Sequence, residues 1–119
     1  MPIPILLALL GGAMPATPVD SQVHNGRAGQ IAVRPPRLDD TVSIDGSLSE
    51  AAWSKAAVLT GFSQFTPVDG VAASDSTEVL VWYSATAIYF GIRAYDRSGA
   101  VRSTLATRDQ IFNDDNVQI

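Results

Sequence analysis

The 119-residue chain contains no cysteine, one histidine, one lysine and two glutamates. The absence of cysteine excludes a disulfide framework, a thiolate metal site and a catalytic thiol, so the core alone must stabilise the folded part. Charge is also scarce, because 17% of the residues are charged, whereas an ordinary soluble domain has about 25%. Eight basic residues against twelve acidic ones give a net charge of −4. This balance leaves no basic stripe for a phosphate backbone, so nucleic-acid binding is disfavoured.

Long apolar runs are also missing. The longest one, residues 3–10, is followed by the small residues Gly11 and Ala13. It is far shorter than the roughly 20 residues of a membrane-spanning helix, but it is typical of a secretory signal. We interpret residues 1–13 as a signal peptide and expect export to the periplasm, the outer membrane or the exterior. The alternative is an apolar, poorly ordered extension.

Residues 14–37 are rich in Pro, Ala, Gly, Gln and Asn and show no apolar period, which is typical of a linker. This segment holds the only histidine, His24. A Ser-His-Asp or Cys-His site needs a rigidly held histidine, so the sequence argues against a hydrolase of either type.

The next segment predicts a corner between a strand and a helix. Residues 41–44 alternate and are β-branched, and Asp45-Gly46 is a strong turn signal. Ser47 and Glu50 have the spacing of a capping box, which predicts a helix of about ten residues starting at Ser47. Trp53 lies in the apolar stripe of that helix, so we expect it in the core. Short strands are also expected at 31–33 and 59–65.

The strongest strand patterns are residues 77–83 and 87–95, which predict an antiparallel hairpin with apolar side chains on both faces. Such strands suit a two-layer sandwich. Residues 116–119 begin another alternating strand. We therefore expect a mostly β fold, an incomplete antiparallel β-sandwich with one short capping helix, in which residues 38–119 form the N-terminal part of a longer, truncated module.

Four segments carry a resemblance in a specific order: SIDGSLSEAAW at 43–53, FSQFTP at 62–67, the hairpin at 77–96, and 108–119. Together they resemble the family 9 carbohydrate-binding module, in particular the copy at the N-terminus of long bacterial exported proteins of unknown function. The resemblance implies a sandwich related to the DOMON fold. It also implies non-catalytic binding of sugar chain ends or short glycans, although Trp53 and Trp82 do not clearly match the tryptophan pair that holds sugar in xylanase-attached members.

Carbohydrate stacking needs an aromatic ring held flat at a surface with polar neighbours. The candidates on and beside the hairpin are Trp82, Tyr83, Tyr89 and Tyr95, with Arg93 as a hydrogen-bond donor. The alternative for each aromatic residue is packing in the core.

Calcium takes six to eight oxygen ligands, and Asp96, Asp109, Asp114 and Asp115 flank turns at strand ends. They predict a structural calcium site or, alternatively, solvated loops. A glycosidase needs a pair of carboxylates. However, both glutamates have a structural interpretation. Glu50 belongs to the predicted capping box, and Glu78 is near the start of a predicted strand. We expect no enzymatic activity in this piece. For the full-length parent, an association with an O-glycosyl hydrolase stays an open alternative.

The sequence thus favours a carbohydrate-binding module of a larger exported protein that acts in polysaccharide breakdown. Its expected partners are a glycan and the remainder of the longer chain. The alternative is a structural or assembly sandwich of an outer-membrane protein that does not bind sugar.

Overall fold

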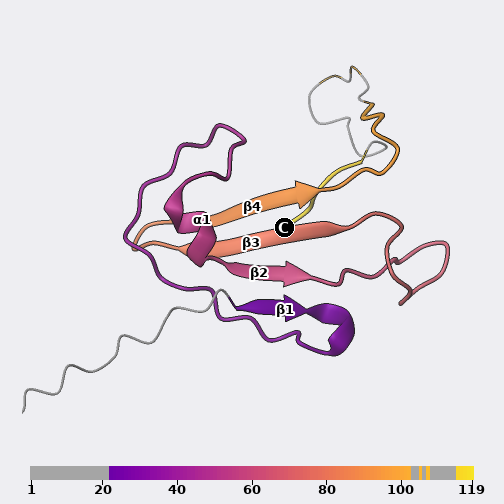
Figure 1. Ribbon diagram of the computed structural model, residues 1–119, viewed down its shortest axis with the longest axis horizontal. Helices are drawn as coiled ribbons and strands as arrows, with labels where there is room; N and C mark the ends of the chain where they lie inside the picture. The colour runs from indigo at the N-terminus through magenta and orange to yellow at the C-terminus, as the bar shows by residue number, and fades with distance from the viewer. Residues whose placement is uncertain (1–21, 103–104, 106, 108–114) are drawn as a thin grey trace, which may run out of the picture.

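The computed structural model describes residues 22–102, 105, 107 and 115–119. These form one four-stranded sheet in the order β1-β2-β3-β4, made of β1 (Val23–Asn25), β2 (Ala57–Thr60), β3 (Thr77–Tyr83) and β4 (Ile88–Ala94) (Figure 1). The mostly β class is confirmed. The sheet is mixed rather than antiparallel, because β1 runs parallel to β2 while the other neighbours are antiparallel. A second sheet is not among the described residues.

The predicted hairpin is confirmed as β3 and β4. Its register runs from Thr77 opposite Ala94 to Tyr83 opposite Ile88. The connecting turn is closed by the Ser84 amide, which donates to the Ala87 carbonyl at 2.8 Å. The Ser84 hydroxyl accepts from the Ala87 amide at 3.2 Å. Two long runs of strand-forming residues separated by a short turn therefore predicted the hairpin correctly.

The helix differs from the expectation, since α1 spans only Ala51–Lys55 and no side chain caps it. The Ser47 amide donates to the Asp45 carboxylate at 2.8 Å, as in an Asx turn. This bond takes the amide that a capping box would have given to Glu50. The Glu50 carboxylate instead accepts from the Ser43 amide and from the Trp53 indole N–H, both at 3.1 Å. The predicted capping box is therefore wrong, and Glu50 ties the preceding loop to Trp53.

The core lies between α1 and one face of the sheet (Figure 1). Trp53 is 5% exposed and meets Trp82 edge to face, with ring centroids 6.0 Å apart. Gly91 lies beneath Trp53, where an added Cβ would come within 2.8 Å of that ring and of the Leu48 side chain. The prediction that Trp53 is a core residue is confirmed.

Three short expected strands at 31–33, 41–44 and 116–119 are absent. The expected strand at 59–65 is replaced by β2, which starts earlier, and by a single bridge between Ser63 and Ala72. At 41–44 the Ser43 amide is bound to Glu50 rather than to a neighbouring strand. Conversely, β1 and its residue His24 lie inside the expected linker, because these residues pair with β2. Pairing partners, and not local propensity, decided these short segments.

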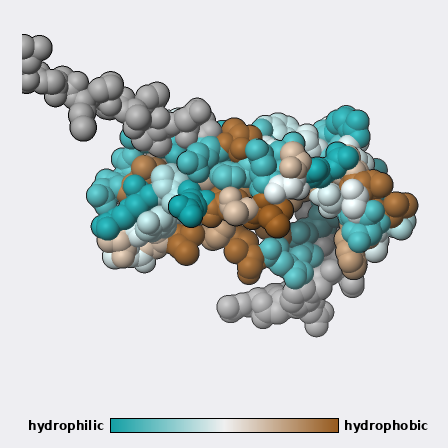
Figure 2. Space-filling model, turned by 90° about the horizontal axis from the view of Figure 1, so that it is seen from below, coloured by the Kyte–Doolittle hydropathy of each residue, from teal (hydrophilic) through white to brown (hydrophobic). Residues whose placement is uncertain are grey.

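The other face of the sheet carries Val79, Val81 and Tyr83 of β3 opposite Ile92, Phe90 and Ile88 of β4. Ile88 is 66% exposed and Phe90 41%. In Figure 2 apolar side chains gather across the middle of the described part and reach its lower side. None of the helices among the described residues has the length and apolarity to cross a membrane.

We predict that Trp53→Ala lowers the free energy of unfolding by about 3 to 5 kcal/mol, because it removes a buried indole and leaves a cavity. Urea denaturation followed by circular dichroism measures the change. Ile44→Ala is the control, since Ile44 is 85% exposed. Equal small losses in both variants would contradict the central role of Trp53.

Candidate functional site

The structure places two of the predicted sugar-binding aromatics against each other. Trp82 is fully buried. Tyr89 is half-buried and stacks on it, with ring centroids 4.0 Å apart and 9° between the ring planes. Trp82 is therefore a core residue and not a surface platform, and one face of the Tyr89 ring is already covered.

The remaining predicted residues lie at opposite ends of the hairpin. Tyr83 ends β3 beside the turn, whereas Tyr95 follows Ala94, which is opposite Thr77 at the far end. Both are exposed. Arg93 lies near Tyr95 and faces Glu78 across the strands, with 3.5 Å between its Nη1 and the Glu78 Oε2. The structure thus brings together Arg93 and Tyr95 but not the whole predicted set.

Glu78 joins these two residues, because Tyr95 also donates its hydroxyl to the Glu78 Oε2 at 3.3 Å. Glu78 and Tyr95 line a pocket of about 240 Å³ that we name the Tyr95 pocket. It combines two aromatic residues with three charged residues and three residues of serine or threonine. Its full lining is Arg27, Thr60, Gly61, Phe62, Ala72, Ala73, Asp75, Ser76, Thr77, Glu78 and Tyr95. The pocket thus presents both aromatic and polar side chains to a ligand.

One wall of the Tyr95 pocket is built by the short 3₁₀ helix η1 (Gly26–Ala28), which follows β1. The Asn25 side chain caps η1 by accepting from the amides of Arg27 at 3.0 Å and Ala28 at 3.2 Å. Gly61 lies directly against the Asn25 side chain, where a Cβ would overlap it, and has a φ of +67°. Glycine is the residue that fits both requirements. This contact fixes the backbone of Arg27 beside the end of β2.

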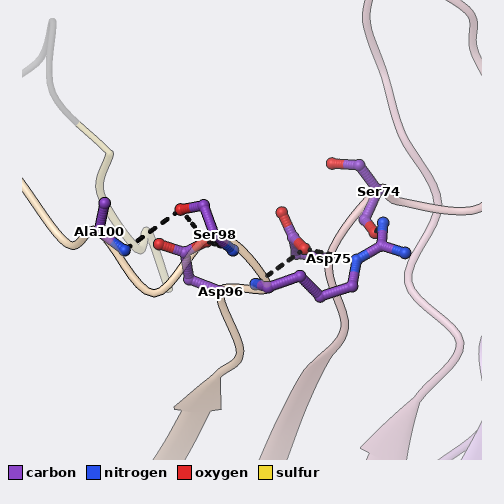
Figure 3. A network of polar contacts seen from close by, with 6 residues as sticks. Ser74, Asp75, Asp96, Ser98 and Ala100 are labelled. Atoms are coloured by element: carbon purple, nitrogen blue, oxygen red, sulfur yellow. Dashed lines mark hydrogen bonds and ion pairs between the residues drawn. The ribbon is translucent and has the colours of Figure 1, made fainter.

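The lining also contains Asp75, which accepts from the Arg97 Nε at 3.0 Å and from the Arg97 amide at 3.4 Å. The Arg97 guanidinium also donates to the Ser74 carbonyl. Figure 3 shows this network beside the turn formed by Asp96, Ser98 and Ala100. Arg97 therefore joins the loop before β3 to the loop after β4.

Asp96, one of the predicted calcium ligands, is used by its own turn. Its Oδ1 accepts from the Ser98 hydroxyl at 2.6 Å and from the Ser98 amide at 2.7 Å. The Ser98 hydroxyl bond and then the Ser98 amide bond lower the pKa of Asp96 from 3.8. Asp115 is exposed, and Asp109 and Asp114 lie outside the described residues. No metal-binding group of three or more His, Asp or Glu occurs in the described ranges, and structural calcium stays a prediction.

The sequence alone did not identify Arg27, Phe62 and Asp75 as site residues. Arg27 lies in a segment with the composition of a linker, and Asp75 in a small polar loop. Phe62 could have been identified from the sequence, because an aromatic residue among polar ones near a strand end is typical of a binding surface. The comparisons give no further guidance: no family model, no curated protein and no solved structure matches the chain.

We predict that Gly61→Ala lowers the free energy of unfolding by more than the roughly 1 kcal/mol expected from its positive φ alone, because the new methyl group would displace Asn25. Gly99→Ala is the matched control, since Gly99 has the same φ of +67° with nothing near its Cβ position. Thermal unfolding compares the two variants. Equal losses would show that the Asn25 contact is unimportant.

We also predict that the carboxyl group of Asp96 titrates below 3.8 in the folded protein, as measured by NMR. The ionised form accepts the Ser98 bonds, so their contribution is present above the unfolded pKa and is lost as the pH falls through the lower folded pKa. Ser98→Ala should return the pKa towards 3.8. A midpoint unchanged by Ser98→Ala would exclude this cause.

Proposed function

We propose that the chain is a non-catalytic carbohydrate-binding module of a larger exported protein linked to polysaccharide breakdown, and that the Tyr95 pocket holds the sugar. The observation that carries this proposal is the presence of Phe62 and Tyr95 in one pocket with the carboxylates of Asp75 and Glu78. Both aromatic residues are exposed, 41% for Phe62 and 49% for Tyr95. Their rings are therefore available to the C–H face of a sugar.

The polar lining supplies partners for sugar hydroxyls. Glu78 and Asp75 offer acceptor oxygens, and Thr60, Ser76 and Thr77 offer hydroxyls that donate or accept. The pocket volume of about 240 Å³ lies below the roughly 300 to 1,000 Å³ of sites that enclose a drug-sized ligand. This size favours one terminal sugar unit over a long enclosed chain. Affinity should be modest, because hydroxyl hydrogen bonds replace bonds to water.

The pairing of the carboxylates supports binding without catalysis. A glycosidase uses one carboxylic acid to protonate the leaving group and a second carboxylate as nucleophile or base. Asp75 is paired with Arg97, and Glu78 is bonded to both Arg93 and Tyr95. Glu50 is engaged by Ser43 and Trp53. These contacts give each of the three carboxylates a structural role.

We predict that Phe62→Ala weakens glycan binding about tenfold, because a stacking ring is lost from the pocket, while the fold is retained. A glycan array identifies a ligand of the wild-type chain, and calorimetry then compares the variants. Phe65→Ala is the control, since Phe65 is 82% exposed and does not line the pocket. If the folded wild type binds no glycan, with or without calcium, the carbohydrate proposal fails.

The alternative is a structural or assembly domain, and the apolar second face of the sheet favours it. Tyr83, Ile88 and Phe90 share that face and are each at least 39% exposed. Contact with a further β-sheet of the longer chain would remove this apolar surface from water. A folded chain that binds no sugar but is stabilised by that longer chain would support this role.

A further inference from the structure

The charged groups around the Tyr95 pocket do not balance. Asp75 and Glu78 line the pocket. Asp75 forms an ion pair with Arg97, and Glu78 forms one with Arg93. Arg27 also lines the pocket, but its guanidinium makes no hydrogen bond or ion pair with another described residue. Among the described residues, three arginines against two carboxylates leave one positive charge at the site.

This local excess contrasts with the whole chain, which has a net charge of −4. A generally acidic protein does not attract anions over long distances, and salt screens such effects beyond about 10 Å. Any preference for an anionic ligand must therefore come from a contact at the pocket itself. Arg27, which has no side-chain partner in the described part of the chain, is the group that can provide it.

Arg27 is also well placed in the chain for this task. Its backbone is held by the Asn25 cap and by the close contact of Asn25 with Gly61. The guanidinium group is a planar fork of donors that binds a carboxylate through two parallel hydrogen bonds. Phe62 and Tyr95 line the same pocket, and both side chains are exposed.

We propose that the ligand of the Tyr95 pocket is an acidic sugar, a uronic acid unit whose carboxylate binds Arg27. A uronic acid combines a ring with an apolar C–H face, hydroxyl groups and one carboxylate. Each of these has a counterpart in the lining. The aromatic residues match the C–H face, the paired carboxylates and the hydroxyls match the sugar hydroxyls, and Arg27 matches the carboxylate. This inference rests on the proposed carbohydrate-binding function and names its substrate class.

The test compares pairs of oligosaccharides that differ only at the carboxyl group, which is ionised in one member and a neutral methyl ester in the other. Oligomers of galacturonic, glucuronic and mannuronic acid and their methyl esters are titrated into the full chain by calorimetry. We expect at least one acid to bind about tenfold more tightly than its ester, and this advantage to shrink as salt is added. Arg27→Ala should reduce that acid to the affinity of its ester, and Arg27→Lys should retain part of the advantage because it keeps the charge.

Arg34→Ala is the matched control, since Arg34 is exposed, has no ion pair with a described residue and does not line the pocket. It should leave both affinities unchanged. Near-ultraviolet circular dichroism of the Trp53 and Trp82 pair verifies that every variant is folded.

The two proposals fail in different ways. If the methyl esters bind as tightly as the acids in every pair, the acidic-sugar inference is overturned and the carbohydrate function stands. If sulfated neutral oligomers bind as tightly as the uronates, the carboxylate assignment is overturned. If Arg27→Ala and Arg34→Ala lower the affinity for the acid equally, the preference comes from the general charge of the protein and not from a contact with Arg27. That result also overturns the inference. If no neutral or acidic saccharide binds, the proposed function itself fails.

Discussion

The contact of Trp53 with Trp82 and Gly91 is the interaction on which the rest of the structure depends. It fixes α1 on the sheet and, through the bond from the Trp53 indole N–H to Glu50, it also orders the loop before α1. β2 starts at Ala57, immediately after α1, so the position of the helix determines where β2 lies. β2 in turn leads into Gly61 and Phe62 at the Tyr95 pocket. The core and the candidate site are therefore connected along the chain through one short strand.

The sequence was most informative where the pattern is long and regular. The two seven-residue strands are rich in β-branched and aromatic residues and are separated by a short turn, so the hairpin was predictable. Its exact register was not, because both faces of the hairpin are apolar. Trp53 was also predictable, because a large ring on an apolar stripe rarely stays exposed. The failure of the capping box was not predictable from the Ser47–Glu50 spacing, because Asp45 binds the Ser47 amide that Glu50 would need. Local motifs of this kind give a list of candidate partners, and the competing side chain decides among them.

The candidate site was predictable only in part, for a physical reason. Alternation divides a strand into two faces, but it does not say which apolar face receives the helix. Trp82 and Tyr83 point to opposite faces of β3 and were therefore equal candidates, although Trp82 lies in the core beneath α1 and Tyr83 is exposed. Arg27 and Asp75 lie in segments whose composition is that of loops, and their place at the pocket depends on the pairing of β1 with β2 and on the Arg97 bridge. Such long-range contacts leave no periodic signal.

The same residue types take different roles in this small domain because their partners differ. Glu50 and Glu78 are the two glutamates of the chain, and both accept hydrogen bonds from aromatic side chains, Trp53 for one and Tyr95 for the other. Glu50 is half-buried, and its bonds hold a loop and a core ring together. Glu78 lines a pocket, and its partner Tyr95 is exposed. A hydrogen bond between a carboxylate and an aromatic donor thus serves packing in one place and orients an exposed ring in the other. At the pocket this bond limits the rotation of Tyr95. Under the proposed function, a ligand that stacks on this ring would therefore lose less conformational entropy on binding.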